Sequence, residues 1–319
     1  MAIIDSYLLE VLEKRGSDLH FMAGDPPRIR LYGDLSPLRQ ERLDPAMVQQ
    51  ALYEIMPKAA VERFEARDGA DFAYTIPDRA RFRVNVLRHV NGMGAVFRAI
   101  PSKALTLDEL KLPDAVRQLC RANQGLILVT GKTGSGKSTT LAAMIDDINT
   151  RVKGHILTIE DPIEFVHQRK NCLISQREVG VHSKSFADAL HSALREDPDV
   201  ILVGELRDLE TMSIAVTAAE MGILVMGTLH TNGAAQTVDR IINVFPADKQ
   251  SHVRTMLSTS LRGVISQQLL QRADKQGRVA ALEILVNTPA AANLIRQGKL
   301  DQLENTMQAG AQYGMRTMD

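Results

Sequence analysis

Residues 131–138 read GKTGSGKS, a pattern that few folds can accommodate. They follow residues 125–130 (GLILVT), an apolar run rich in strand formers, and precede residues 139–148, whose apolar side chains recur with helical spacing. A strand, a glycine-rich turn and a helix in this order are the context in which G-x-x-x-x-G-K-[ST] forms a phosphate-binding loop. We therefore expect a P-loop, and a chance glycine-rich surface loop is the weaker alternative.

The P-loop hypothesis explains why glycine, lysine and serine occur in this motif. Glycines let the backbone turn tightly and point N–H groups at phosphate oxygens, and the helix N-terminus adds a partial positive charge. Lys137 is expected to reach the β- and γ-phosphates of ATP, and Ser138 to ligate Mg²⁺. The residues expected to bind ATP are Thr133, Gly134, Ser135, Gly136, Lys137, Ser138 and Thr139.

Carboxylates follow two further strand patterns. Residues 199–205 (DVILVGE) end in Glu205, at the Walker-B position that holds Mg²⁺ directly or through water, with Gly204 where Asp is more usual. The segment ILTIEDPIEF clusters three carboxylates after another strand, and Glu164 is the candidate general base for an attacking water. The alternatives are a carboxylate that starts a helix and a solvated acidic turn.

Other candidate residues are a histidine and a group of arginines. GTLHTN places His230 at a strand end, where an imidazole can contact the γ-phosphate, although a lone histidine is more often structural. Arg81 and Arg83 are two residues apart and share one strand face, and Arg98 follows nearby. Arginine supplied from a neighbouring domain or subunit is a common device in phosphate hydrolysis. An exposed strand face with salt bridges is the alternative.

The pattern of helices and strands predicts two domains. Residues 1–100 predict a small α+β domain with helices over 3–14 and 45–66 and alternating strands. A proline-punctuated linker over 101–113 precedes residues 114–319, where strands and helices alternate before a mostly helical C-terminal part. This alternation predicts an α/β fold with a mainly parallel sheet and the P-loop at its carboxyl edge.

The composition of the chain limits which kind of partner it can bind and where in the cell it is expected to work. Lys and Arg total 38 and Asp and Glu total 38, and this zero formal charge argues against nucleic acid as the main partner, so a DNA translocase is a weak rival. No apolar run approaches the ~20 residues of a membrane span, and the N-terminus carries charges too early for a signal peptide. Cys120 and Cys172 lack metal-binding spacing and are expected to be reduced and buried. We expect a cytoplasmic protein.

The set of motifs resembles the secretion-superfamily ATPases, and in particular the type IV pilus retraction ATPases of the PilT/PilU group. The resemblance covers nearly the whole chain and rests on GKTGSGKSTTLAAM, TIEDPIEFVH, LREDPDVILVGELRD and GTLHT, after GSDLHFMAG and RFRVNV. It implies a hexameric ring whose subunits each have a PAS-like N-terminal domain and a RecA-like ATPase domain. ATP with Mg²⁺ would be bound between domains.

The resemblance also implies roles for the candidate residues. EDPIE is similar to the family's Asp box, LVGE to its Walker B and GTLHT to its His box, while Arg81, Arg83 and Arg98 match the arginines that complete the ATP site. Hydrolysis would power pilus disassembly, and hence twitching motility, through an inner-membrane platform protein on which the ring docks. A paralogous retraction ATPase is a further expected partner.

Two departures from the group motivate an alternative function. The His box of the group usually begins with a second histidine, where this chain has Ile223. Its C-terminal motif PAIRNLIRE reads PAAANLIRQ here, with Ala291 and Ala292 in place of Ile and Arg. The alternative is a low-turnover nucleotide-binding ring subunit that modulates a paralogous motor. Pilus extension and secretion ATPases share the core motifs and are further alternatives.

Overall fold

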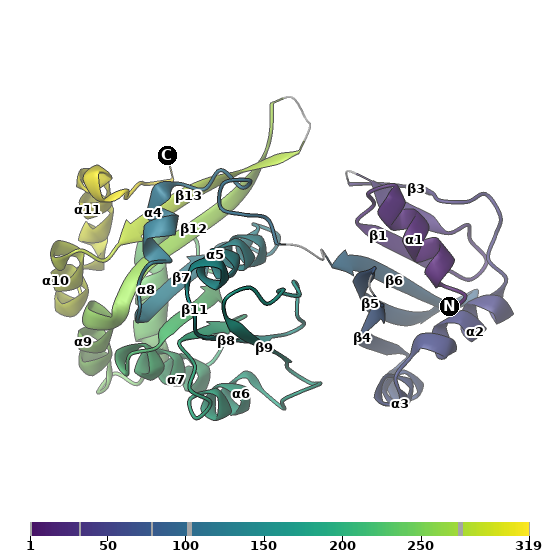
Figure 1. The fold of residues 1–319 in the computed structure, drawn as a ribbon, viewed down its shortest axis with the longest axis horizontal. Coiled ribbons are helices and arrows are strands. Elements are labelled where there is room, and N and C mark those ends of the chain that lie inside the picture. Colours follow the sequence, from purple (N-terminus) through teal and green to yellow (C-terminus); the bar gives the residue numbers. More distant parts are fainter. Residues whose placement is uncertain (1, 32, 78, 101–103, 274–276, 319) are drawn as a thin grey trace. The chain divides into compact units, whose positions relative to one another are not determined.

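The chain folds into two compact units, Met1–Ser102 and Lys103–Asp319. Each unit has its own sheet in the computed structural model (Figure 1). The structure describes residues 2–31, 33–77, 79–100, 104–273 and 277–318.

The first unit is an antiparallel sheet with helices packed on one face. Its helices are α1 (Asp5–Glu13), α2 (Pro45–Ile55) and α3 (Lys58–Arg67). Its strands are β1 (Asp18–Met22), β2 (Arg28–Leu31), β3 (Asp34–Pro37), β4 (Gly69–Ile76), β5 (Ala80–His89) and β6 (Gly92–Ile100), in the order β3-β2-β1-β6-β5-β4. The core between sheet and helices is filled by large side chains, including Phe21, Phe64, Phe82 and Phe97.

Strand β5 shows why the sheet has one polar face. Phe82 and Val84 are buried in the core, whereas Arg83 and Asn85 between and after them are exposed. Successive side chains of a strand point to opposite faces, so burial of the apolar set turns the polar set outward. The arginines therefore lie on the sheet face opposite the helices.

The single helix expected over residues 45–66 is wrong, because the structure has two helices there. Helix α2 ends at Ile55, Met56 is extended, and α3 starts after Pro57. Proline disfavours helical geometry in the residue before it and lacks the N–H that would continue the helix. The small α+β character expected for this part of the chain is confirmed.

The second unit contains the expected α/β alternation. Its helices are α4 (Asp114–Leu119), α5 (Lys137–Arg151), α6 (Phe186–Ala193), α7 (Leu209–Glu220), α8 (Ala234–Val244), α9 (Gln250–Ser260), α10 (Pro289–Gln297) and α11 (Leu303–Ala309), with 3-10 turns at Leu300–Gln302 and Ala311–Tyr313. Its strands are β7 (Gly125–Thr130), β8 (His155–Glu160), β9 (Leu173–Glu178), β10 (Val200–Val203), β11 (Leu224–Leu229), β12 (Leu261–Gln271) and β13 (Arg278–Val286).

The sheet of the second unit is mainly parallel, which confirms the predicted fold class. Its strand order is β13-β12-β7-β11-β10-β8-β9, and the pair β12–β13 is antiparallel while the other neighbours are parallel. Strand β7 is buried throughout. Its Leu126 and Leu128 pack with residues of α6 to α9, whereas Ile127 and Val129 pack with residues of α4 and α5. Helices thus cover both faces of the sheet (Figure 1).

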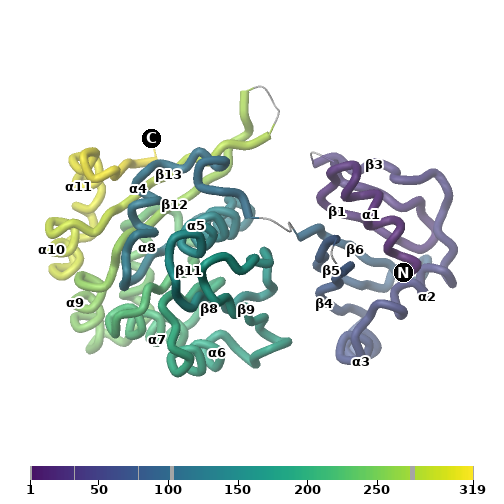
Figure 2. The backbone as a smooth tube through the Cα atoms, viewed as in Figure 1, coloured from purple at the N-terminus to yellow at the C-terminus, as the bar shows by residue number. Residues whose placement is uncertain are grey.

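The expectation of a mostly helical C-terminal part is wrong for β12 and β13. These strands form a long hairpin at the edge of the sheet (Figure 2). The first part of β12 is buried on both faces, so its sequence, LRGVISQ, shows no apolar–polar alternation. A short apolar run of this kind does not distinguish a buried strand from a helix.

Part of the expected linker packs on the second unit. Residues 101–103 lie outside the described residues, but Leu107 is buried in the same core cluster as Val116 of α4. Cys120 and Cys172 are free and buried, as expected. Within the described parts of the chain, no helix has the length and apolar character needed to cross a membrane.

Candidate functional site

The predicted P-loop, Walker B, Asp box and His box converge on one edge of the parallel sheet. Strands β7, β11, β10 and β8 are consecutive in the sheet. The chain leaves their carboxyl ends at Gly131, His230, Gly204 and Asp161, respectively. Because the carboxyl ends of parallel strands lie at the same edge, these four loops meet there. Ligands of open α/β sheets bind at this edge.

The P-loop backbone depends on glycine. Gly131, Gly134 and Gly136 have φ angles of 137°, 79° and 89°, which side chains with a Cβ rarely adopt. Helix α5 starts directly after them, and its N-terminus has no side-chain cap. Its first N–H groups are therefore available to an anion. The loop and first helical turn hold the remaining expected ATP-binding residues, Thr133, Ser135, Ser138 and Thr139.

Lys137 bridges the loop in the structure. Its Nζ donates to the carbonyl oxygens of Gly131 at 2.8 Å and Lys132 at 3.1 Å. Burial lowers the pKa of Lys137, and the negative charges of Glu205 and Glu164 partly oppose this effect. Lys137 therefore lies close enough to Glu205 and Glu164 for both carboxylates to favour its charged form.

Glu205 is held by two neighbours. Arg207 Nη2 lies 2.7 Å from one carboxylate oxygen, and His230 Nε2 lies 3.2 Å from the other. Burial alone would raise the pKa of Glu205, but the hydrogen bond and charge of Arg207, with a smaller contribution from His230, bring the pKa below its usual value. Glu205 is thus an ionised carboxylate, and each of its two oxygens has a cationic or polar neighbour.

The space around residue 204, directly before Glu205, favours glycine over residues with a side chain. A Cβ on Gly204 would lie 3.2 Å from both the Cα of Glu160 and the carbonyl oxygen of Ile159. An aspartate, which is more usual at this position, would require the end of β8 to shift by a few tenths of an ångström. Glu205 therefore carries the Walker-B charge alone.

The Asp box contains one buried and one exposed glutamate. Glu160 is 8% exposed and accepts a hydrogen bond from Thr158 Oγ1 at 2.7 Å, and burial raises its pKa. The backbone N–H of Glu164 donates to Glu160 at 3.3 Å, while the Glu164 side chain is exposed. Glu160 therefore supports the turn, and the Glu164 carboxylate faces solvent.

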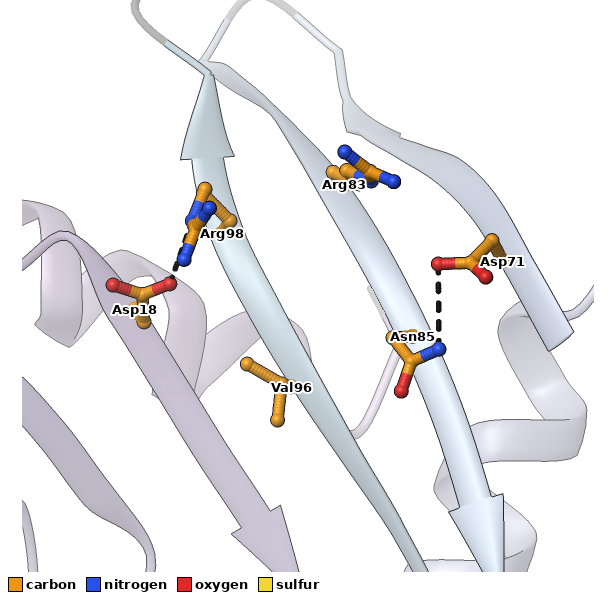
Figure 3. A pocket seen from close by; sticks show the side chains of 6 residues that line it. All are labelled: Asp18, Asp71, Arg83, Asn85, Val96 and Arg98. Carbon is orange, nitrogen blue, oxygen red and sulfur yellow. Dashed lines mark hydrogen bonds and ion pairs between the residues drawn. The ribbon is translucent and has the colours of Figure 1, made fainter. Parts of the chain in front are cut away.

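Among the candidate arginines of the first unit, Arg98 lies beside the buried carboxylate of Asp18 (Figure 3). Arg83 and Arg98 are opposite each other on β5 and β6, and Arg98 Nε donates to Asp18 at 2.8 Å. The Asp18 side chain is only 4% exposed and that of Arg98 is 68% exposed. With Asp71, Asn85 and Val96, these three residues line a cavity of about 290 Å³. Arg81 is on the same strand as Arg83 and is half-buried.

Sequence reasoning missed Arg207 and Asp18. Arg207 lies two residues after the Walker-B glutamate in GELRD, so a basic residue at this spacing was the available signal. Asp18 lies in GSDLH, where a carboxylate directly before the strand residues LHFM was the available signal for a buried partner of a cation.

The donor groups at the sheet edge fit ATP and Mg²⁺. The cradle of N–H groups and Lys137 suits phosphate oxygens, and a Cβ at Gly134 would meet only open space, so the loop is accessible there. The Ser138 hydroxyl and the Glu205 carboxylate are oxygen ligands, which Mg²⁺ prefers in combination with substrate phosphates.

Comparisons with known proteins agree with this chemistry. The family described as "Type II/IV secretion system protein" matches residues 1–313. The type IV pilus retraction ATPase PilT of Pseudomonas aeruginosa is 52% identical over 98% of this chain and 91% of its own length. The type IV pilus ATPase PilU of the same species is 42% identical over 97% of this chain and 81% of its own. A crystal structure of the pilus retraction motor PilT with bound ADP superposes with a TM-score of 0.91 at 47% identity, covering 97% and 90% of the two chains.

Proposed function

Because the chain belongs to the type II/IV secretion system protein family, we propose that it is an ATPase motor that powers type IV pilus retraction. The relatives named for pilus retraction match it over almost their whole length. The observation that carries the proposal is the convergence of the P-loop with Glu164, Glu205 and His230 at one sheet edge. Its reaction is ATP + H₂O → ADP + phosphate.

The residues of the site divide the chemistry among them. Lys137 exchanges its two carbonyl partners for phosphate oxygens when ATP arrives, because a charged acceptor makes the stronger hydrogen bond. Glu164 takes a proton from the attacking water. His230, which lies 3.2 Å from Glu205 at the end of β11, would contact the γ-phosphate. Ser138 and Glu205 would hold Mg²⁺, which neutralises charge on the transferring phosphate.

The arginine face of the first unit supplies positive charge from another domain. Arg81, Arg83 and Arg98 stabilise the negative charge that develops during hydrolysis. Because they belong to a separate unit, their approach and withdrawal would couple hydrolysis to domain movement. We propose that the motor is a hexameric ring docked on the cytoplasmic face of the inner membrane at a platform protein, and that a PilU-like paralogue is a further partner.

The position of Ile223 argues against the low-turnover alternative. Ile223 precedes the first residue of β11 and packs against the core, whereas His230 follows its last residue. At ~3.3 Å per strand residue the two positions are roughly 20 Å apart, because they lie at opposite ends of β11. Loss of a histidine at residue 223 therefore leaves the candidate catalytic edge unchanged. Glu164 and Glu205 are both present there, which favours turnover.

A steady-state ATPase assay tests the enzymatic part of the proposal. Lys137→Ala is expected to abolish turnover while the melting temperature stays near that of the wild type, because this side chain faces the ligand. Lys249→Ala, at an exposed position before α9, is the matched control. Near-normal turnover in Lys137→Ala contradicts the proposed role, and a collapsed melting temperature shows that the lysine is structural.

Deletion of the gene in the native host tests whether the motor drives pilus retraction or pilus extension. Surface pili and twitching are scored in the deletion strain and in a strain complemented with wild type or Lys137→Ala. Excess pili with lost twitching support retraction, and absent pili support extension instead.

A further inference from the structure

Gln267 lies at the level of the P-loop on the neighbouring strand. Strand β12 runs parallel to β7, and Ser266 is in register with Thr130, the last residue before the loop. Gln267 is the next residue along β12 and is 3% exposed. A buried amide has to satisfy its hydrogen bonds inside the protein, so its partners indicate what it holds.

Both ends of the Gln267 amide are bonded to the P-loop region. Its Nε2 donates to the carbonyl oxygen of Ser135 in the loop at 2.7 Å. Its Oε1 accepts from Thr140 Oγ1 in the first turn of α5, also at 2.7 Å. One side chain of β12 thus ties the loop to the helix that follows it.

The loop also packs closely against Gln267. A Cβ on Gly131 would lie 2.2 Å from the Gln267 carbonyl oxygen, and a Cβ on Gly136 would lie 2.7 Å from its Nε2. The backbone of β12 therefore requires glycine at residue 131, while at residue 136 a side chain would displace the Gln267 amide from its place against the loop. Because the peptide bond is trans, the Gly136 N–H points opposite to the Ser135 carbonyl and hence away from the Gln267 amide.

The opposite face of the same strand holds the segment after His230. Ser266 Oγ accepts from the N–H of Gly233 at 2.9 Å, and Glu283 of β13 accepts from the N–H of Ala234 at 2.6 Å. These N–H groups form the start of α8. Adjacent residues of β12 thus fix the P-loop on one face and the His-box segment on the other.

We propose that Gln267 is a positioning residue that holds the P-loop in its phosphate-binding shape before nucleotide arrives. The proposal rests on the proposed function, since it requires that this loop binds a nucleotide. Without the amide the loop has to be ordered at the moment of binding, and this ordering reduces affinity. The loop contacts phosphates in both ground state and transition state, so the loss falls on KM and Kd more than on kcat.

The test compares Gln267→Met with Gln268→Met in the full chain. Methionine has a similar length but lacks the amide, and Gln268 is exposed on the other face of β12, which makes it the matched control. Calorimetric titration with ADP, steady-state kcat and KM, and nucleotide-free melting are measured for each. Gln267→Met should weaken ADP binding and raise KM by about tenfold, the effect of two lost hydrogen bonds, with kcat within about twofold. Gln268→Met should match the wild type.

Wild-type ADP affinity and KM in Gln267→Met overturn the proposal, as does a fall in kcat alone. If Gln267→Met does not fold, Thr140→Val removes the bond to Gln267 Oε1 from the helix side and should raise both constants, and unchanged values overturn the proposal. Loss of folding in both variants overturns it too, because the contact is then core structure. A wild-type chain that binds no ADP contradicts the proposed function itself, whereas equal binding in wild type and variant contradicts only the role of Gln267.

Discussion

Arg207 Nη2 lies 2.7 Å from Glu205 Oε2, and His230 Nε2 lies 3.2 Å from the other oxygen of the same carboxylate. Both oxygens of the proposed Mg²⁺ ligand therefore already have partners. A metal ion that binds Glu205 has to displace or share one of them. The ion pair with Arg207 is the stronger competitor, because the guanidinium is always charged.

Arg207→Gln should lower the Mg²⁺ concentration that gives half-maximal ATPase activity. The Arg207 side chain is 59% exposed, and an exposed ion pair contributes up to about 1 kcal/mol, which corresponds to about fivefold in apparent Mg²⁺ affinity. Mg²⁺ titration of the ATPase rate at saturating ATP measures this shift. The matched control is Arg117→Gln, which breaks the ion pair with Asp108 at α4. An increased Mg²⁺ requirement in Arg207→Gln means that the arginine orients Glu205 for the metal instead of competing with it.

Glu164 and Glu205 should give different kinetic defects. Glu164→Gln should leave ATP binding largely intact and reduce kcat by about 10²-fold or more, the usual contribution of a general base. Glu205→Gln should mainly increase the Mg²⁺ requirement, because the amide is a weaker ligand. Measurements of turnover, ATP affinity and Mg²⁺ dependence of each variant separate the two roles. The control is Glu304→Gln, because the Glu304 side chain is exposed on α11. If Glu164→Gln turns over normally, Glu160 is the next candidate base.

His167 should make the protein less stable as the pH falls. Burial lowers the pKa of His167 from 6.5 to about 4, so the unfolded chain binds more protons between these values. The free energy of unfolding therefore rises with pH across this window, and the contribution is complete above pH 6.5 and lost as the pH falls towards 4. Between pH 7 and pH 4.5 the effect of this one residue should be about 2 kcal/mol.

Urea unfolding at pH 7 and pH 4.5 measures that effect for wild type and His167→Asn. The variant should lose less stability on acidification, although it can be less stable at pH 7. His252→Asn, at an exposed position of α9, is the matched control and should follow the wild type. Parallel losses in wild type and His167→Asn contradict the prediction.

The sequence predicted the elements whose pattern is local. The P-loop context was predictable because β7 and α5 flank a motif with one backbone solution. The split between α2 and α3 was signalled by Pro57 but was missed, since apolar spacing continues across it. Strands β12 and β13 were missed because burial on both faces of the sheet removes alternation from β12.

Residues of the candidate site could be predicted from the sequence only where the residue type itself indicates a chemical role, as for a carboxylate or a histidine. The carboxylates and His230 follow strands that become neighbours, so their convergence follows from parallel topology. Gln267 carried no comparable signal, because its role comes from the register of β12 with β7. The bond between Arg98 and Asp18 likewise depends on pairing between β1 and β6, which are distant in sequence.

The arginines of the first unit should act on the ATP site of a neighbouring subunit. An arginine placed at the γ-phosphate can contribute 10³–10⁵ in rate in other phosphoryl-transfer systems, but only when its guanidinium reaches the phosphate. Arg83 and Arg98 face the same cavity on a unit separate from the one that holds Lys137. The resemblance to the pilus retraction ATPases favours an arrangement in which the arginines of one subunit complete the ATP site of its neighbour.

Mixed rings distinguish action between subunits from action within one. Lys137→Ala and the double variant Arg83→Ala/Arg98→Ala are each expected to be inactive alone. If the arginines act between subunits, about one site in four of a randomly mixed ring combines an intact lysine with intact arginines, and ATPase activity returns in part. If they act within one chain, every site retains a defect and the mixture stays inactive. Arg88→Ala is the control, because Arg88 lies on the same strand but packs over Phe64 on the helix side. Absence of recovery in rings shown by mass to be mixed excludes action between subunits, and normal activity of the double variant excludes any catalytic role for these arginines.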